Sequence, residues 1–172
     1  MRKRGKRNVV VFVSYARLNS RLASTFLSLF KQQVGASKSY RYSFWRDTDI
    51  LVGEDWKKAI ENAIDECHLG LLLISPAFLG SDYISRNELP RLLRRREKVV
   101  IPVMLQPVDP EHHDLKGLDY RQIFRLQRVT FRGGPKAFAG CKGEERNEFA
   151  LELFRQVEAR LNKQFGSGSP QR

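Results

Sequence analysis

The chain has 172 residues, of which 41% are hydrophobic and 10% aromatic, so it can bury the core of one domain and is not a disordered chain. Its two cysteines exclude a disulfide scaffold, and its apolar runs are far shorter than the roughly 20 residues of a membrane span. A net charge of +12 invites a nucleic-acid partner, but no zinc-finger spacing and no basic region with heptads accompanies it. We expect a soluble cytoplasmic protein, with nucleic acid or an anionic membrane as a minor alternative partner.

The positive charge is concentrated at two places. Five basic residues lie within residues 1–7, and a second group lies between Arg91 and Lys98. Residues 1–8 are therefore interpreted as a basic arm, residues 9–165 as a single domain, and residues 166–172, which contain Gly and Ser, as a flexible tail or linker. A C-terminal sensor domain beyond that tail is an expected partner.

The first half of the chain alternates between strand and helix patterns. A continuous β-branched apolar run at residues 9–13 predicts a buried strand, and Asn19 or Ser20 can cap the helix that follows. Residues 42–45 predict a short aromatic strand, and residues 46–54 a polar loop. A second helix begins at Asp55, and its spacing places Trp56 in the core.

The same alternation continues through the second half. Residues 69–74 and 99–105 predict buried strands, and a basic helix lies between them. Pro102 indicates that the second of these strands lies near a sheet edge or contains a bulge. Residues 126–131 predict a fifth strand, and a long amphipathic helix closes the chain. This order predicts a three-layer α/β domain of the flavodoxin-like kind, with a central five-stranded parallel sheet that gathers ligands at the carboxyl ends of its strands.

Several functions of such a sheet lack their motifs here. The sequence has neither the P-loop pattern GxxxxGK[ST] nor GxGxxG after the first strand, and no aspartate follows the third strand as a phosphoacceptor site requires. His112 and His113 lie in a proline-bearing loop without further ligands at metal spacing, so we interpret them as surface histidines and expect no metal site.

Aromatic and charged side chains do follow the predicted strands. Together they would form a cleft with aromatic faces for ring stacking, a guanidinium for a phosphate, and carboxylates for ribose hydroxyls or a sugar cation. The candidates are Tyr15, Arg17, Trp45, Asp47, Tyr83 and Glu88.

Three segments in order resemble the Toll/interleukin-receptor (TIR) domain family. Residues 11–16 (VFVSYA) are similar to its opening box, residues 44–56 (FWRDTDILVGEDW) to its second box and BB loop, and residues 72–83 with Glu88-Leu89 to the segment that carries the catalytic glutamate of bacterial TIR enzymes. The resemblance extends from about residue 9 to about residue 161.

The resemblance implies cleavage of NAD+ at the nicotinamide–ribose bond, in bacterial anti-phage immunity, with Glu88 as the catalytic carboxylate. The substrate-binding candidates are then Tyr15, Arg17, Trp45, Asp47 and Tyr83, and NAD+ is a substrate, with no cofactor expected. The co-product is ADP-ribose or a cyclic isomer of it. Self-association through the BB loop, with Asp49, Gly53 and Asp55, is expected to activate the enzyme. The alternative within the family is a non-catalytic adaptor or scaffold.

Each candidate also has a structural interpretation. Ser85 and Glu88 fit the capping box S-x-x-E at a helix start, with Pro90 in the first turn. Tyr15 and Trp45 can be strand-end packing, Asp47 can cap a turn of the BB loop, and Arg17 can be a solvated surface residue.

Overall fold

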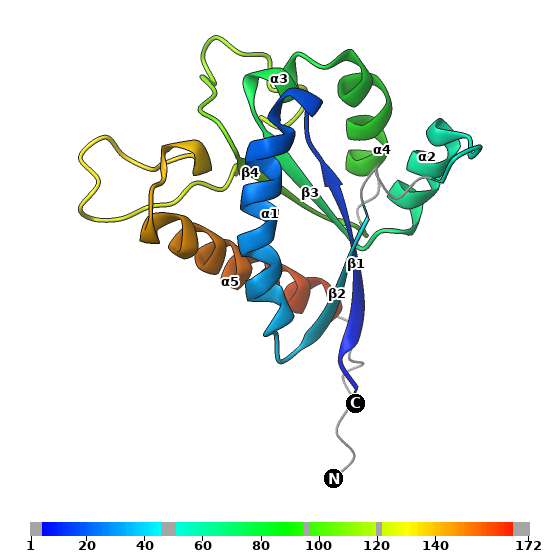
Figure 1. Ribbon diagram of the computed structural model, residues 1–172, viewed down its shortest axis with the longest axis horizontal. Coiled ribbons are helices and arrows are strands. Elements are labelled where there is room, and N and C mark those ends of the chain that lie inside the picture. The colour runs from blue at the N-terminus through cyan, green and yellow to red at the C-terminus, as the bar shows by residue number, and fades with distance from the viewer. Residues whose placement is uncertain (1–4, 46–50, 95–96, 120–121, 167–172) are drawn as a thin grey trace.

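Within the residues that the structure describes, four parallel strands form the central sheet, in the order β2-β1-β3-β4 (Figure 1). The computed structural model describes residues 5–45, 51–94, 97–119 and 122–166. The strands are β1 (Arg7–Ser14), β2 (Tyr40–Trp45), β3 (Leu69–Ile74) and β4 (Val99–Met104). Every residue of β3 and β4 is buried, which accounts for their continuous apolar sequences.

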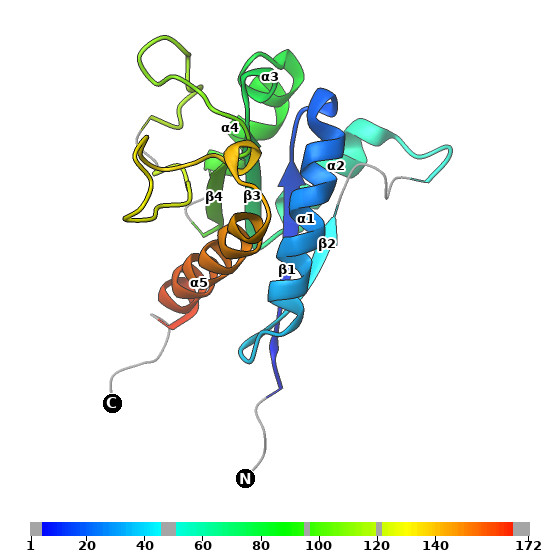
Figure 2. The ribbon, with the colours of Figure 1, turned by 60° about the vertical axis from the view of Figure 1, so that its left-hand side comes forward.

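Helices cover both faces of this sheet (Figures 1 and 2). Helices α1 (Ser20–Gly35) and α5 (Glu144–Gly166) share one hydrophobic core with β1, and α2 (Trp56–Glu66) and α4 (Leu89–Arg94) share a second core on the opposite face. The short helix α3 (Pro76–Leu79) follows β3 directly. Among the described residues no helix is both long enough and apolar enough to cross a membrane.

Alternation along β1 decides which side chains reach which core. Val9, Val11 and Val13 pack against α1 and α5, whereas Phe12 packs against α2 and α4. Because side chains alternate along a strand, the buried Ser14 at the end of β1 lies on the same face as Phe12. That placement brings its hydroxyl beneath the segment between α3 and α4.

The expected fifth strand at residues 126–131 is wrong. In the described part of the chain the sheet ends at β4, where Phe124 adds a single parallel bridge by donating its N–H to the Pro102 carbonyl over 2.8 Å. Leu126 pairs instead with Lys136 in an antiparallel bridge, and Val129 is fully exposed. Pro102 does lie on the edge strand of the sheet, as its missing N–H predicts.

The start of β1 and the end of α5 meet at the amino end of the sheet. The Arg7 guanidinium lies 3.5 Å from the centre of the Phe165 ring. Arg7 also pairs with Tyr40 of β2, so the first strand begins within the predicted basic arm. This junction lies at the opposite end of the sheet from Ser14.

Candidate functional site

Glu88 is a buried carboxylate near the carboxyl end of β1. Its side chain accepts a hydrogen bond from the Ser14 hydroxyl, and the residue is only 8% exposed. Burying a charged carboxylate is costly unless hydrogen bonds replace its water. The fold therefore holds the Glu88 carboxylate in a fixed position, unlike a carboxylate on the exposed surface of a helix.

A widened helical turn presents Glu88. Residues Ile84–Glu88 form a π-helical turn, closed by the Leu89 N–H donating to the Ile84 carbonyl five residues earlier. A proline inside a helix clashes with the carbonyl four residues before it, which for Pro90 is that of Arg86, and the widened turn accommodates this conflict. The Asn87 amide donates to the Tyr83 carbonyl over 3.1 Å within the same turn.

The alternative of a capping box at Ser85 and Glu88 is wrong. Ser85 lies inside the helical segment, and its N–H donates to the Ser81 carbonyl over 3.0 Å. The Ser81 hydroxyl accepts from the Ile84 N–H instead, at 3.3 Å, so Ser81 caps this segment. The carboxylate of Glu88 is thus directed to Ser14 and not to a helix terminus.

Two aromatic candidates lie on the same face of the sheet as Glu88. The half-buried Trp45 stacks on Phe12, with ring centroids 5.3 Å apart, and Tyr83 packs against the same core. Burial, followed by the charges of Glu88 and Glu61, raises the pKa of Tyr83 to about 12. The phenol therefore stays protonated at neutral pH and can donate a hydrogen bond.

Trp56 is not a core residue as its helical spacing predicted. It is 51% exposed, and its ring lies 5.1 Å from the ring of Tyr83. Asp55 in front of it caps α2, since its side chain accepts from the Lys58 N–H over 3.2 Å. Trp56 thus adds an exposed aromatic face beside Tyr83.

The remaining candidates are placed differently. Tyr15 packs against the core shared with α1 and α5, on the other face from Trp45 and Tyr83, and Arg17 is exposed in the 3-10 turn that follows. Gly53 is exposed with φ of +89°. Asp47 and Asp49 lie outside the described residues.

A polar network that sequence reasoning missed joins the segments that follow β1, β3 and β4. The Ser75 hydroxyl donates to Asn19 Oδ1 over 2.6 Å, and the Asn19 amide donates to Gln106 Oε1 over 2.9 Å. Ser75 also accepts from the Phe78 N–H at 3.0 Å, which caps α3. The available signal was Ser75 directly after the third strand and Gln106 two residues after the fourth; the sequence indicates only a helix-capping role for Asn19.

A large hollow of about 770 Å³ lies elsewhere, along β4 and α5. Its lining includes Val100, Pro102, Phe124 and Leu153, with Arg125 and Arg160 among its charged residues. We place the candidate site at Glu88 and not at this hollow, because a buried, hydrogen-bonded carboxylate indicates a functional site more strongly than the size of a hollow does.

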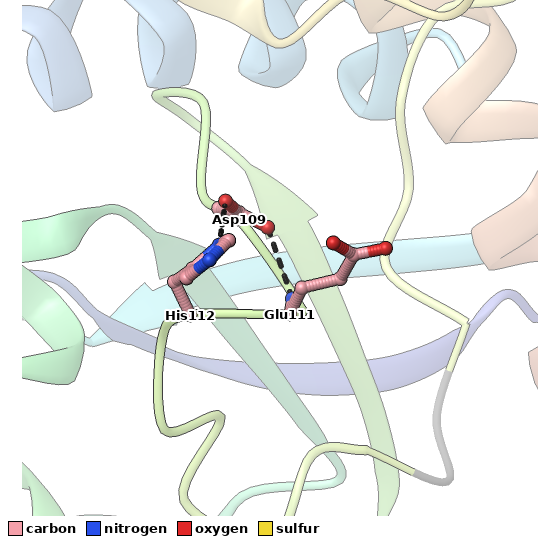
Figure 3. Close-up of side chains that lie close together, drawn as sticks. All are labelled: Asp109, Glu111 and His112. Atoms are coloured by element: carbon pink, nitrogen blue, oxygen red, sulfur yellow. Dashed lines mark hydrogen bonds and ion pairs between the residues drawn. The ribbon is translucent and has the colours of Figure 1, made fainter.

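A cluster of possible metal ligands occurs on the loop after β4 (Figure 3). The ligand atoms of Asp109, Glu111 and His112 lie within 4.8 Å of one another, and all three residues are exposed. Asp109 bonds to His112 Nδ1 at 2.6 Å and accepts from the Glu111 N–H at 2.9 Å. These bonds of a surface turn account for the proximity, and we assign no site to it.

A family model, a curated relative and a solved structure are similar to this chain. A family model described as "TIR domain" matches residues 11–135. The chain is 34% identical over 108 residues to a Sinorhizobium fredii protein named "Uncharacterized protein y4lF", covering 59% of this chain but only 32% of that protein. The crystal structure of the RPS4 and RRS1 TIR domain heterodimer is similar in fold, with a TM-score of 0.51 and 13% identity over 89% of this chain and 97% of that one.

Proposed function

The chain belongs to the TIR domain family, and on that premise we propose that it is an NAD+ glycohydrolase with Glu88 as its catalytic carboxylate. The observation that carries the proposal is the burial of Glu88 at the end of β1, where the Ser14 hydroxyl donates to it. Carboxyl ends of parallel strands are where α/β domains bind ligands. Aromatic side chains stand on the same face of the sheet.

A single carboxylate is sufficient for this reaction. Ordinary glycosidases use two, because an alkoxide leaving group must be protonated as it departs. Nicotinamide in NAD+ already carries the positive charge and leaves as a neutral molecule, taking the electrons of the C1′–N bond. Water then bonds to C1′ and releases a proton, giving ADP-ribose; attack by another atom of the same molecule gives the cyclic isomer.

Each residue near Glu88 has a separate role in the proposed reaction. The negative charge of Glu88 stabilises the cationic ribose of the transition state and orients the ribose hydroxyls. Ser14 holds the carboxylate. The protonated phenol of Tyr83 is buried without a partner among the described residues, and we propose that it donates to a substrate oxygen when NAD+ displaces the side chains that cover it. Trp45 and the exposed face of Trp56 offer surfaces for ring stacking.

Self-association is the proposed activator. The RPS4 and RRS1 structure is a heterodimer of TIR domains. In this chain Leu51 is 70% exposed and Val52 fully exposed beside Gly53, and apolar residues so exposed favour burial against a partner. We propose that this loop, with Asp49, Gly53 and Asp55, pairs copies of the chain as the effector module of a bacterial anti-phage protein.

The test is NAD+ turnover by purified wild type at high concentration, beside Glu88→Gln and the matched control Glu66→Gln. Glu66 is an exposed acid on α2, so its loss removes the same charge outside the candidate site. We expect nicotinamide release by wild type and Glu66→Gln, and a rate about 100- to 1000-fold lower for Glu88→Gln. Chromatography of the co-product distinguishes ADP-ribose from its cyclic isomer.

Two outcomes contradict the proposal in different ways. If wild type is folded and assembled but releases no nicotinamide, the chain is an adaptor or scaffold. If Glu88→Gln turns over as fast as wild type, the activity stands and Glu88 is not its catalytic residue. Circular dichroism of both variants shows whether each is folded.

A further inference from the structure

β2 forms the outer edge of the sheet on the side opposite β4. It pairs with β1 along residues 40–45, and in the described part of the chain no strand pairs with its other side. Alternate residues of a parallel strand direct their N–H and C=O groups away from the neighbouring strand. This edge therefore offers a row of backbone donors and acceptors to an added strand.

A hollow of about 550 Å³ accompanies this edge. It is lined by β2, by the end of α1 and by Lys6. The charged side chains of its lining are Lys6, Lys31 and Arg41, and the lining includes no acidic residue. Any segment laid along β2 thus meets positive charge.

The aromatic residues of the hollow are already engaged by the fold. Tyr40 is 7% exposed, and the Tyr42 hydroxyl donates to Glu158 of α5 over 2.8 Å. Lys31 lies over the Phe44 ring, 5.0 Å from its centre. Proteins that bind single-stranded nucleic acid use exposed aromatic rings for base stacking. Because the rings here are already in contact with other side chains, the hollow favours a peptide over a nucleic acid.

We propose that the outer edge of β2 binds an extended acidic segment of another protein as an added strand. Hydrogen bonds between the two backbones would supply affinity. The three basic side chains would supply selectivity for acidic residues. A second copy of this chain fits poorly, because pairing two β2 edges brings their basic side chains together and like charges on paired strands destabilise.

The first experiment is fluorescence anisotropy with a labelled, blocked hexapeptide of alternating glutamate and valine. Binding to the full chain is compared with binding to Arg41→Glu and to Lys142→Glu. Both positions are exposed and both changes alter the net charge equally, but only Arg41 lines the hollow. We expect affinity to fall about tenfold or more for Arg41→Glu and to change little for Lys142→Glu.

The second experiment separates strand addition from simple charge attraction. The same hexapeptide with alternate backbone nitrogens methylated keeps its charge but loses the hydrogen-bond donors along one edge. We prepare both of the two alternating patterns, and we expect binding to be lost for the pattern that blocks the edge facing β2. Undiminished binding of both methylated peptides, equal loss in both charge variants, or no binding of the acidic peptide at all would overturn the proposal. Tighter binding of oligo-dT that displaces the peptide would assign the edge to nucleic acid instead.

Discussion

Tyr83 has a buried hydroxyl group without a hydrogen-bond partner in the described part of the chain. An unpaired buried hydroxyl destabilises a fold by about 1–3 kcal/mol, so Tyr83→Phe is expected to keep or raise the free energy of unfolding. If the phenol donates to NAD+, the same change lowers kcat/KM about tenfold. Urea unfolding and NAD+ turnover measured on one preparation test both parts.

Tyr40→Phe is the matched control. Its hydroxyl donates to Asn162 over 2.7 Å, far from Glu88, so its removal should lower the free energy of unfolding by about 1 kcal/mol and leave turnover unchanged. A Tyr83→Phe variant that is destabilised like Tyr40→Phe, with full turnover, would give Tyr83 a purely structural role.

For single residues, the sequence predicts the element in which a residue lies better than it predicts the contacts of its side chain. Trp45 and Tyr83 pack against the same core, on the face of the sheet to which Ser14 and Glu88 belong, and their part in a site stays a prediction. The pairing of Ser14 with Glu88 is not predictable from the sequence, because a contact across 74 positions leaves no local pattern. The prediction that Trp56 is buried was wrong, because helical spacing gives the face of a residue but not how far along the helix the packing extends. Trp56 is the first residue of α2 and lies beyond the packed part.

The π-helical turn before α4 is the element that sets the direction of Glu88. Replacing Pro90 with alanine restores a backbone donor and removes the clash with the Arg86 carbonyl, so the turn can tighten to a regular helix. We expect Pro90→Ala to raise the melting temperature and to lower NAD+ turnover at least about tenfold, because Glu88 rotates relative to Ser14.

Pro76→Ala provides the comparison for that variant. Pro76 occupies the first position of α3, where proline is well tolerated, so we expect little change in turnover. Full activity of a stabilised Pro90→Ala would show that the widened turn has no part in catalysis.

The loop before α2 is tested by Gly53→Val. A Cβ at Gly53 would meet open space, so the cost is conformational: at φ of +89° a side chain is strained, by about 1–2 kcal/mol. We expect the strain to move the loop and to reduce self-association and NAD+ turnover together, measured by light scattering and nicotinamide release. Gly133→Val, in equally open space without a positive φ, should change neither. Normal assembly with lost activity would count against assembly as the activator.

The predicted elements agree with the structure where burial dominates. The third strand was predicted at its observed bounds, Leu69–Ile74, because all six residues are buried and apolar. The fifth strand failed because residues 126–131 extend no ladder of the sheet in the described part of the chain. The bridge to β4 forms two residues earlier, at Phe124, and Leu126 makes a single bridge to Lys136. Pairing is a property of the whole sheet that a local pattern does not report.

On the scale of the whole molecule, His68 joins β1, β3 and β4 at the amino end of the sheet. Its Nδ1 accepts from the Val10 N–H over 3.0 Å, and its own backbone bonds to Val10 and Val99. Burial, then the charges of Arg7 and Lys98, lower the pKa of His68 below its ordinary 6.5. At a pH just below 6.5, His68 is therefore protonated more often in the unfolded chain than in the folded protein.

The consequence is a stability that depends on pH. The contribution of neutral His68 is complete above its unfolded pKa of 6.5 and is lost as the pH falls below that value. We expect the free energy of unfolding, from urea titrations, to fall between pH 7.5 and 5 by at most about 1.4 kcal/mol per pH unit from this group. His68→Asn keeps an acceptor that does not titrate, and should flatten the profile; an unchanged slope would exclude His68 as its source.

The meeting of Arg7 with Phe165 also fixes how the domain can be tethered. Both ends of the described fold leave the sheet at its amino end, whereas Ser14 and Glu88 lie at its carboxyl end. A surface, a fluorescent reporter or a crosslinker attached through either end would therefore present the Glu88 side to solution. Immobilised chains attached in this way can be compared with freely diffusing ones, so the effect of crowding copies together can be measured without obstructing the candidate site.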